Sequence, residues 1–314
     1  MNVALASSGT GSLPGIDTLR LFALVLVTWQ HAASVLGAYS ETQWRGISPG
    51  QTGVAIFCAL SAYLAFRTSP SSLSAWWQKR VLRLFPAYWI VTIAAFGLAW
   101  GVQGRPFDPA LFASQMLGLG YFTHGWELIN VVSWFISLLL LCYGVASLAW
   151  LSRWPRTLLA IAVLLAAVLL ATRLEVALSR HLIAFALGAM LAMTPQQWPL
   201  LLLGGVLGSI GVLLDPQFFY AGVALLLTAA ATRSKPLAVP GASLLSRYTY
   251  EYFLLHGIFL AALAHILLPR LAVPWQQALS VVMGAVVLSM LAAVLLERVV
   301  AQLPALSRYL GKSA

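Results

Sequence analysis

The stretch "LRLFALVLVTWQHAASVLG" (residues 19–37) is almost wholly apolar, yet it contains Arg20 and His31. A helix needs about 20 apolar residues to cross the hydrocarbon core of a bilayer, and this stretch has that length. Ionisable side chains are costly at that depth and mark functional sites when they occur there. The stretch therefore predicts a membrane-spanning helix whose two polar residues have a role.

The composition of the whole chain agrees with a membrane protein. Of the 314 residues 61% are hydrophobic and only 8% are charged, whereas soluble domains have about 25% charged residues. The net charge of +10 comes from scattered Lys and Arg, and without a basic run we expect no nucleic-acid partner. Cys58 and Cys142 lie in apolar runs, which favours buried thiols over a disulfide or a metal pair. The opening residues lack the features of a cleavable signal peptide, so the first apolar helix would direct insertion.

The apolar segments predict an all-α polytopic membrane protein with about ten transmembrane helices in one bundle. No repeat or separate soluble domain interrupts them, so we expect a single domain over residues 1–314 with a transmembrane core of about 16–300. The expected spans lie near 17–37, 52–67, 84–102, 128–150, 157–172, 178–194, 198–214, 217–232, 248–268 and 276–299.

The basic residues of the loops predict the orientation. An N-terminus in the cytoplasm places these basic residues inside: Arg67, Lys79, Arg80, Arg83, Arg153, Arg156, Arg233, Lys235, Arg247, Arg298, Arg308 and Lys312. It leaves fewer outside: Arg45, Arg105, Arg173, Arg180 and Arg270. The positive-inside rule then favours both termini in the cytoplasm of a multi-pass protein of the inner (cytoplasmic) membrane. The long outer segment over 101–130 would form a re-entrant or interfacial piece.

Arg20 and His31 have a spacing that puts them on one helix face. Eleven residues correspond to roughly 16 Å along the axis and to about 20° more than three full turns. Arg20 would lie near the cytoplasmic surface and His31 well inside the membrane. Singly, Arg20 could be an interfacial anchor paired with Asp17 at i, i+3, and His31 a hydrogen-bonded packing residue. Together, the pair favours a functional face.

A second group of polar residues lies in "WWQKRVLRLFPAYW" (76–89). Arg80 and Arg83 are at i, i+3, where two guanidiniums can clamp a phosphate or pyrophosphate. The alternative is a pair of positive-inside anchors in an interfacial Trp belt. In "FCALSAYLAF" (57–66) the hydroxyls of Ser61 and Tyr63 each need a partner, and for Ser61 a bond to its own helix backbone is the simpler explanation.

A third group, "SRYTYEYFLLHGIF" (246–259), contains Glu251 and His256. Five residues turn a helix by about 500°, so these two side chains should point about 140° apart. Glu251 could line a cavity or neutralise one of the arginines, namely Arg20, Arg80 or Arg83. The other histidines (His124, His181 and His265) are isolated, so we expect no metal site.

These segments together resemble the acyltransferase 3 family of integral membrane enzymes. "IDTLRLFALVLVTWQH" is similar to the family's first helix, in which an Arg is followed after ten residues by a His. "FCALSAYLAF" resembles its second helix, although Ala62 stands where the family usually has Gly. "RVLRLFPAYW" resembles its Arg-x-x-Arg segment, and "YTYEYFLLHGIF" its late segment with Tyr and His. Leu139 in "SWFISLLLLCY" stands where many members have Glu, so no role for that Glu is carried over.

The resemblance implies an O-acyltransferase that takes an acyl group, usually acetyl, from cytoplasmic acyl-CoA without a bound cofactor. The acceptor would be a hydroxyl of a cell-envelope glycan or glycolipid precursor, and His31 would be the general base. Arg20, Arg80 and Arg83 would bind the donor phosphates. The residues expected to support this site or line its cavity are Asp17, Ser61, Tyr63, Trp134, Glu251 and His256.

Two alternatives remain at this level. The same residues could line the path of a transporter or exporter of a glycan or a lipid-linked intermediate. The same fold could also use another donor, such as succinyl-CoA. The sequence does not distinguish direct transfer to the acceptor from transfer through an acyl-enzyme.

Overall fold

The computed structural model describes residues 14–68, 70–233, 239–270 and 273–303. Three of the basic residues expected in the cytoplasm, Lys235, Arg308 and Lys312, lie outside these ranges, as does the opening segment over 1–13. Within the described residues the chain is helical, and no strand occurs apart from a single bridge between Trp44 and Ile47. The prediction of an all-α protein is confirmed.

Thirteen α-helices and one 3-10 helix make up the described chain. In chain order they are α1 (Pro14–Val35), η1 (Ser40–Thr42), α2 (Pro49–Phe66), α3 (Leu73–Gly101), α4 (Pro109–Met116), α5 (Gly120–His124), α6 (Ser133–Leu151), α7 (Pro155–Ala171), α8 (Ala177–Met193), α9 (Trp198–Leu213), α10 (Pro216–Arg233), α11 (Ala242–Ser246), α12 (Thr249–Leu267) and α13 (Pro274–Ala301).

Six of the described helices (α1, α2, α3, α6, α12 and α13) are long and apolar enough to cross a membrane. Three shorter apolar helices accompany them, namely α7, α8 and α9. The chain is therefore a membrane protein with several spanning helices. The total of ten crossings and the cytoplasmic position of both termini stay predictions.

The predicted boundaries differ most at α3 and α6. The third helix begins at Leu73 and not near residue 84, because the Ser72 hydroxyl caps its first turn by accepting a hydrogen bond from the backbone N–H of Ala75. The polar turn that contains Arg80 therefore belongs to the same helix as the apolar span. The sixth helix begins at Ser133, five residues later than its expected start.

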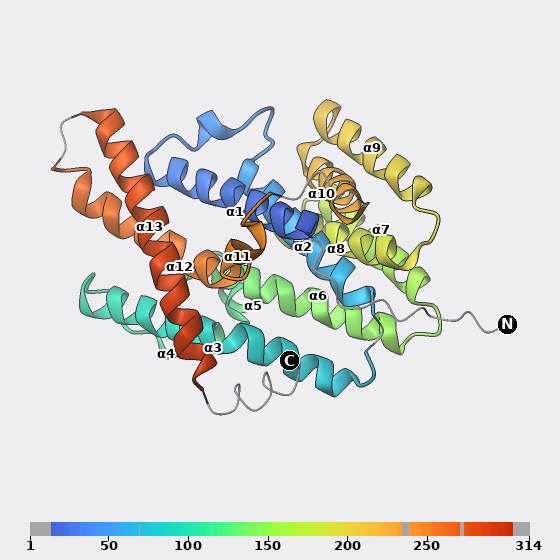
Figure 1. Cartoon of the computed structure of the whole chain (residues 1–314), viewed down its shortest axis with the longest axis horizontal. Helices are drawn as coiled ribbons and strands as arrows, with labels where there is room; N and C mark the ends of the chain where they lie inside the picture. The colour runs from blue at the N-terminus through green and yellow to red at the C-terminus, as the bar shows by residue number, and fades with distance from the viewer. Residues whose placement is uncertain (1–13, 69, 234–238, 271–272, 304–314) are drawn as a thin grey trace.

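The helix α2 lies in the middle of the bundle and packs against α1, α8 and α10 (Figure 1). Small residues allow the close approach that helix pairs in membranes use. A Cβ atom at Gly188 of α8 would collide with the carbonyl oxygen of Ala59 on α2, and one at Gly53 of α2 would collide with that of Ala23 on α1. At the edges of the bundle, α9 packs on α10 and α13 packs on α12.

The segment over 101–130 forms the short helices α4 and α5, which are attached to α3 and α6 by polar contacts. The side chain of Gln115 is fully buried, and its Oε1 accepts hydrogen bonds from the backbone N–H of Asn130 (3.1 Å) and from Ser133 Oγ (3.2 Å). The Trp89 indole N–H donates to the carbonyl oxygen of Met116 (2.8 Å). The expected burial of Cys58 and Cys142 as free thiols is confirmed.

Candidate functional site

His31 and His256 meet between α1 and α12. The Nδ1 atom of His31 lies 2.8 Å from the Nε2 atom of His256. The two ring planes differ by only 9° and the centroids are 4.9 Å apart. The nitrogens are thus much closer than the ring centres, which means that the rings meet edge to edge in nearly one plane. This is the geometry of a direct imidazole–imidazole hydrogen bond.

The backbone determines the direction of this hydrogen bond. His256 Nδ1 lies 2.8 Å from the carbonyl oxygen of Phe253, which can only accept, so Nδ1 is the protonated nitrogen of a neutral His256. Its Nε2 is then an acceptor, and His31 must donate from Nδ1. The Nε2 atom of His31 is left with a free lone pair. It has no partner among the residues that the structure describes, and it is not fully buried.

Aromatic rings of α12 surround His256 and fix its orientation. The His256 side chain is fully buried. The Tyr252 ring lies parallel to it, with centroids 5.8 Å apart, and the Phe253 ring lies 5.6 Å away. The Tyr252 hydroxyl accepts a hydrogen bond from Thr28 of α1 at 3.4 Å. A second polar contact between α1 and α12 thus lies one turn from the histidine pair.

Arg20 forms the ion pair that its spacing predicts. Its Nη1 lies 3.1 Å from Asp17 Oδ1, and both side chains are partly buried. Arg20 is also close enough to Arg83 for the two positive charges to repel each other. The structure therefore brings two of the three expected donor-binding arginines, from α1 and α3, to one region of the protein.

Glu251 pairs with Arg83, one of the three arginines that the sequence left open. The distance between Glu251 Oε1 and Arg83 Nη1 is 3.3 Å, and the carboxyl group is only 2% exposed. Its Oε2 is buried without a partner among the described residues. Arg83 also donates to the carbonyl oxygen of Arg247, which itself pairs with Glu297 of α13. These contacts join α3, α12 and α13.

Arg80 has different partners from Arg83, so the i, i+3 spacing does not bring the two guanidiniums onto one protein group. The Arg80 guanidinium lies 5.2 Å from the Trp76 ring and 5.8 Å from the Tyr143 ring, within the range of cation–π interactions. Two N–H groups at this position, Arg80 Nε and Trp76 Nε1, are buried and have no acceptor within the described part of the chain. Such unpaired donors are suited to an anionic ligand.

An apolar groove of about 690 Å³ runs between α1, α12 and α13. Thr28 and Tyr252 form a polar spot in its wall, and Glu41 and Thr42 lie at one end. Because Tyr252 lies against His256, one ring separates this groove from the histidine pair. The groove is therefore adjacent to the histidine pair, although neither histidine lines it.

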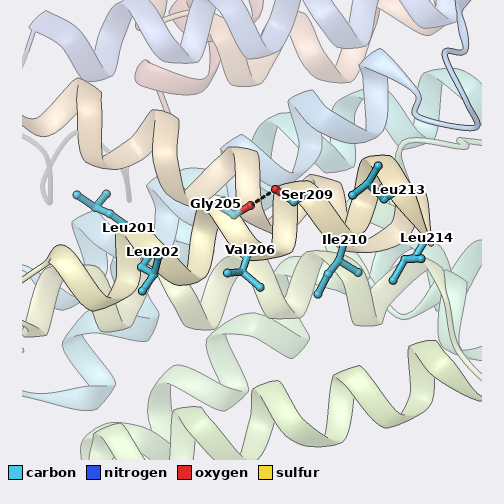
Figure 2. A pocket seen from close by; sticks show the side chains of 8 residues that line it. All are labelled: Leu201, Leu202, Gly205, Val206, Ser209, Ile210, Leu213 and Leu214. Carbon is cyan, nitrogen blue, oxygen red and sulfur yellow. Dashed lines mark hydrogen bonds between the residues drawn. The ribbon is translucent and has the colours of Figure 1, made fainter.

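A second hollow, of about 570 Å³, lies along α9 and has no catalytic groups. Figure 2 shows the residues that line it, and Ser209 is the one among them with a polar side chain. The Ser209 hydroxyl donates to the carbonyl oxygen of Gly205 on its own helix (2.9 Å). This hollow fits the outward face of a membrane helix and not a reaction site.

Three other residues were expected to support the site, namely Trp134, Ser61 and Tyr63. In the part of the chain that the structure describes, they make no hydrogen bond or ring contact with the histidine pair or the expected donor-binding arginines. Trp134 is buried between Trp126, Phe135 and His181. The hydroxyls of Ser61 and Tyr63 make no hydrogen bond to any described residue, so the expected bond from Ser61 to the backbone of its own helix is absent. No group of three potential metal ligands occurs among the residues that the structure describes.

Sequence reasoning missed the contact between the two histidines. Their positions are 225 residues apart, and no helix periodicity relates positions on different helices. The sequence contains only an indirect indication that the two histidines belong to one site, namely that each lies in a segment resembling the same family.

Apolar helices of membrane length that enclose a histidine pair and ion-paired arginines define an integral membrane protein with a polar interior. Comparison with protein-family models matches residues 13–298 to the acyltransferase domain of the acyltransferase 3 family, and the chain belongs to that family. It is thus a membrane acyltransferase. No curated protein and no solved structure matches it.

Proposed function

We propose that the protein transfers an acetyl group from cytoplasmic acetyl-CoA to a hydroxyl of a cell-envelope glycan or glycolipid precursor. The observation that carries this proposal is the pair of consecutive hydrogen bonds from His31 to His256 and from His256 to the Phe253 carbonyl oxygen. They leave His31 Nε2 as a free base. The protein would lie in the inner membrane, cross it ten times, and have both termini in the cytoplasm.

In this mechanism His31 Nε2 removes the proton of the acceptor hydroxyl while its oxygen attacks the thioester carbonyl carbon. The C–S bond of the donor breaks, an ester forms, and the CoA thiolate takes the proton back from His31. The imidazolium that forms on His31 donates through Nδ1 to the neutral His256, which stabilises the charge and holds the ring, as the acid of a catalytic triad does. No Ser, Thr or Cys among the described residues is hydrogen-bonded to either histidine, which supports direct transfer.

Arg20, Arg80 and Arg83 would bind the phosphates of CoA. Arg20 and Arg83 repel each other, so an anion between them would be favourable. The unpaired donors of Arg80 and Trp76 support a further contact with a phosphate oxygen or with another acceptor on the donor. The roughly 16 Å between Arg20 and His31 along α1 leaves room for the extended arm of CoA.

The decisive experiment measures transfer from labelled acetyl-CoA by the protein in detergent, with a panel of glycan acceptors and succinyl-CoA as a competing donor. His31→Ala should lower kcat by about 10²–10⁴-fold, the usual contribution of a general base. His265→Ala, which removes an exposed histidine of α12, is the matched control and should leave the rate unchanged. A wild-type rate for His31→Ala would exclude the proposed base.

Donor binding is tested separately. Arg80→Ala combined with Arg83→Ala should abolish CoA binding measured by calorimetry. Arg153→Ala, an exposed arginine of the α6–α7 connection, is the control and should bind CoA normally. Unchanged affinity in the double variant would make Arg80 and Arg83 anchors of the membrane topology.

A further inference from the structure

Arg180 in the first turn of α8 is held in a fixed orientation by neutral groups. Its Nη1 donates to Gln217 Oε1 of α10 at 2.7 Å, and its guanidinium lies 5.5 Å from the Tyr220 ring. Its Nε is buried without a partner among the described residues. The side chain is therefore positioned before any ligand binds, and it retains unused hydrogen-bonding capacity.

The positive charge of Arg180 has no carboxylate in ion-pair contact. Glu175 attracts Arg180 at longer range, but its carboxylate accepts hydrogen bonds from the Tyr121 hydroxyl (3.4 Å) and the Leu178 backbone N–H (2.9 Å). Arg180 forms no ion pair with any described residue. By contrast, Arg173 in the preceding turn pairs with Asp215 at 2.9 Å. A largely buried cation without an ion pair is costly unless a ligand supplies the anion.

The groups around Arg180 suit a saccharide. Tyr39, Tyr121 and Tyr220 all lie near its guanidinium, and Tyr39 is 40% exposed. Burial, followed by the nearby Glu175 carboxylate, raises the pKa of Tyr121 to about 12, so its hydroxyl keeps its proton and donates it to Glu175. Aromatic rings, phenolic hydroxyls and planar amides beside an arginine combine an apolar surface with directional hydrogen bonds.

The next residue, His181, offers an unused acceptor nearby. Its Nε2 lies 2.9 Å from Gln51 Oε1, an acceptor, so Nε2 is the protonated nitrogen. Its Nδ1 is fully buried and has no partner among the described residues. The ring also packs 5.7 Å from Trp134. Gln51, His181 and Trp134 thus form a second polar and aromatic group, at the residue that follows Arg180 in α8.

This cluster is linked to the candidate base. Gln30, the residue before His31 on α1, donates to the Tyr39 hydroxyl at 3.4 Å. Gln30 Oε1 also accepts from the backbone N–H of Gly50 at 2.6 Å, which fixes the connection between α1 and α2. A ligand at Arg180 and Tyr39 therefore lies at the same end of α1 as His31.

We infer that Arg180, with Tyr39, binds an anionic group of the acceptor, so that the acceptor is an acidic saccharide carrying a carboxylate or a phosphate. The guanidinium forms paired hydrogen bonds with either anion. The role of this ligand as the acceptor rests on the proposed function, whereas its binding does not.

Binding is measured with the detergent-solubilised protein without donor, using galacturonic acid trimer, galactose trimer as its neutral match, and a glycerol phosphate oligomer. At least one acidic probe should bind at least about tenfold more tightly than the neutral probe, as expected for a charge-assisted hydrogen bond. Arg180→Gln should abolish this preference. Arg173→Gln, which removes a neighbouring arginine that is already ion-paired, should retain it.

Equal binding of acidic and neutral probes, or a preference that survives in Arg180→Gln, would overturn the inference. A readout on the unmodified protein keeps the test independent of whether the variant folds: the affinity for the acidic probe must fall as NaCl concentration rises. Salt-independent binding would contradict a site built on Arg180. The trimer and the oligomer distinguish a carboxylate from a phosphate.

The acyl-transfer assay separates this inference from the proposed function. Acidic probes that bind through Arg180 but are not acetylated from acetyl-CoA would support the site and contradict the role of its ligand as acceptor. Acetylation of neutral glycans without any preference for acidic ones would support the acyltransferase and refute the role of the Arg180 ligand as its acceptor.

Discussion

His31 of α1 donates from Nδ1 to His256 Nε2 of α12 across 2.8 Å, and His256 in turn donates to the carbonyl oxygen of Phe253. The backbone of α12 therefore fixes the tautomer of a side chain on α1. A carbonyl oxygen can only accept a hydrogen bond, so both hydrogen bonds point from His31 toward Phe253. The nitrogen that keeps a free lone pair is His31 Nε2.

Replacing His256 tests this arrangement. His256→Phe keeps an aromatic ring but removes the acceptor of the His31 proton, so His31 loses its fixed tautomer and the stabilisation of its imidazolium. We expect kcat to fall by about 10²-fold or more while KM for acetyl-CoA stays unchanged. Steady-state kinetics with labelled acetyl-CoA measure both.

A conservative variant distinguishes positioning from packing. His256→Gln offers an amide oxygen that can accept from His31, so it should recover part of the kcat that His256→Phe loses. Equal kcat values for the two variants, or a wild-type kcat for His256→Phe, would show that the hydrogen bond has no part in the reaction.

The ion pair between Arg83 and Glu251 should contribute to stability as well as to donor binding. Arg83→Ala leaves the carboxylate of Glu251, which is 2% exposed, without its cation. Because Arg83 is half exposed and water screens its charge, we expect a loss of about 1–3 kcal/mol and not the larger cost of a fully buried pair. Thermal unfolding in detergent measures the change.

The double variant is the control for this prediction. Glu251→Gln in the Arg83→Ala background removes the unpaired charge, so the double variant should be more stable than Arg83→Ala alone. If both unfold at the same temperature, the carboxylate does not depend on Arg83.

Local geometry explains what the sequence could predict about this site. The pair of Asp17 and Arg20 is at i, i+3 on one helix, so its spacing alone indicates the contact, and the structure confirms it. Arg80 lies four residues after Trp76, so that cation–π contact was also within reach of helix spacing. The contacts of Arg80 with Tyr143, and of His31 with His256, join different helices, and their formation depends on how the helices pack.

For the fold too, the sequence predicts features within single helices but not how the helices pack against each other. Apolar length predicts the spanning helices, because the bilayer sets that length independently of tertiary structure. The start of α3 was misplaced because Lys79, Arg80 and Arg83 interrupt its apolar residues before position 84, although Ser72 provides a cap. The cluster at Arg180 could not be foreseen, since its members come from α2, α5, α8, α10 and the connection after α1.

The contact between α2 and α8 should be intolerant of even one added methyl group. A Cβ atom at Gly188 would collide with the backbone of Ala59, and a backbone cannot move aside as a flexible side chain can. We expect Gly188→Ala to destabilise the protein by about 1–3 kcal/mol, the usual cost of overpacking. Gly205→Ala on α9, where a Cβ meets open space, is the matched control and should not lower the unfolding temperature.

The accessibility of cysteines tests the proposed topology. Cys58 and Cys142 are fully buried, so neither should react with a membrane-impermeant maleimide in intact cells or in inverted vesicles. Because the native cysteines do not react, single cysteines can be introduced at exposed positions without first removing the native ones. Ser40→Cys in the α1–α2 connection and Gln196→Cys in the α8–α9 connection suit this purpose.

With both termini in the cytoplasm and ten crossings, the two connections lie on opposite sides of the membrane. Ser40→Cys should be labelled in intact cells of a host that lacks an outer-membrane barrier, and Gln196→Cys only in inverted vesicles. The reverse pattern would place His31 near the cytoplasmic surface and would invalidate the proposed path of the donor. Labelling of both positions from one side would show that the helices between them cross the membrane an even number of times, and the count of ten would then be wrong.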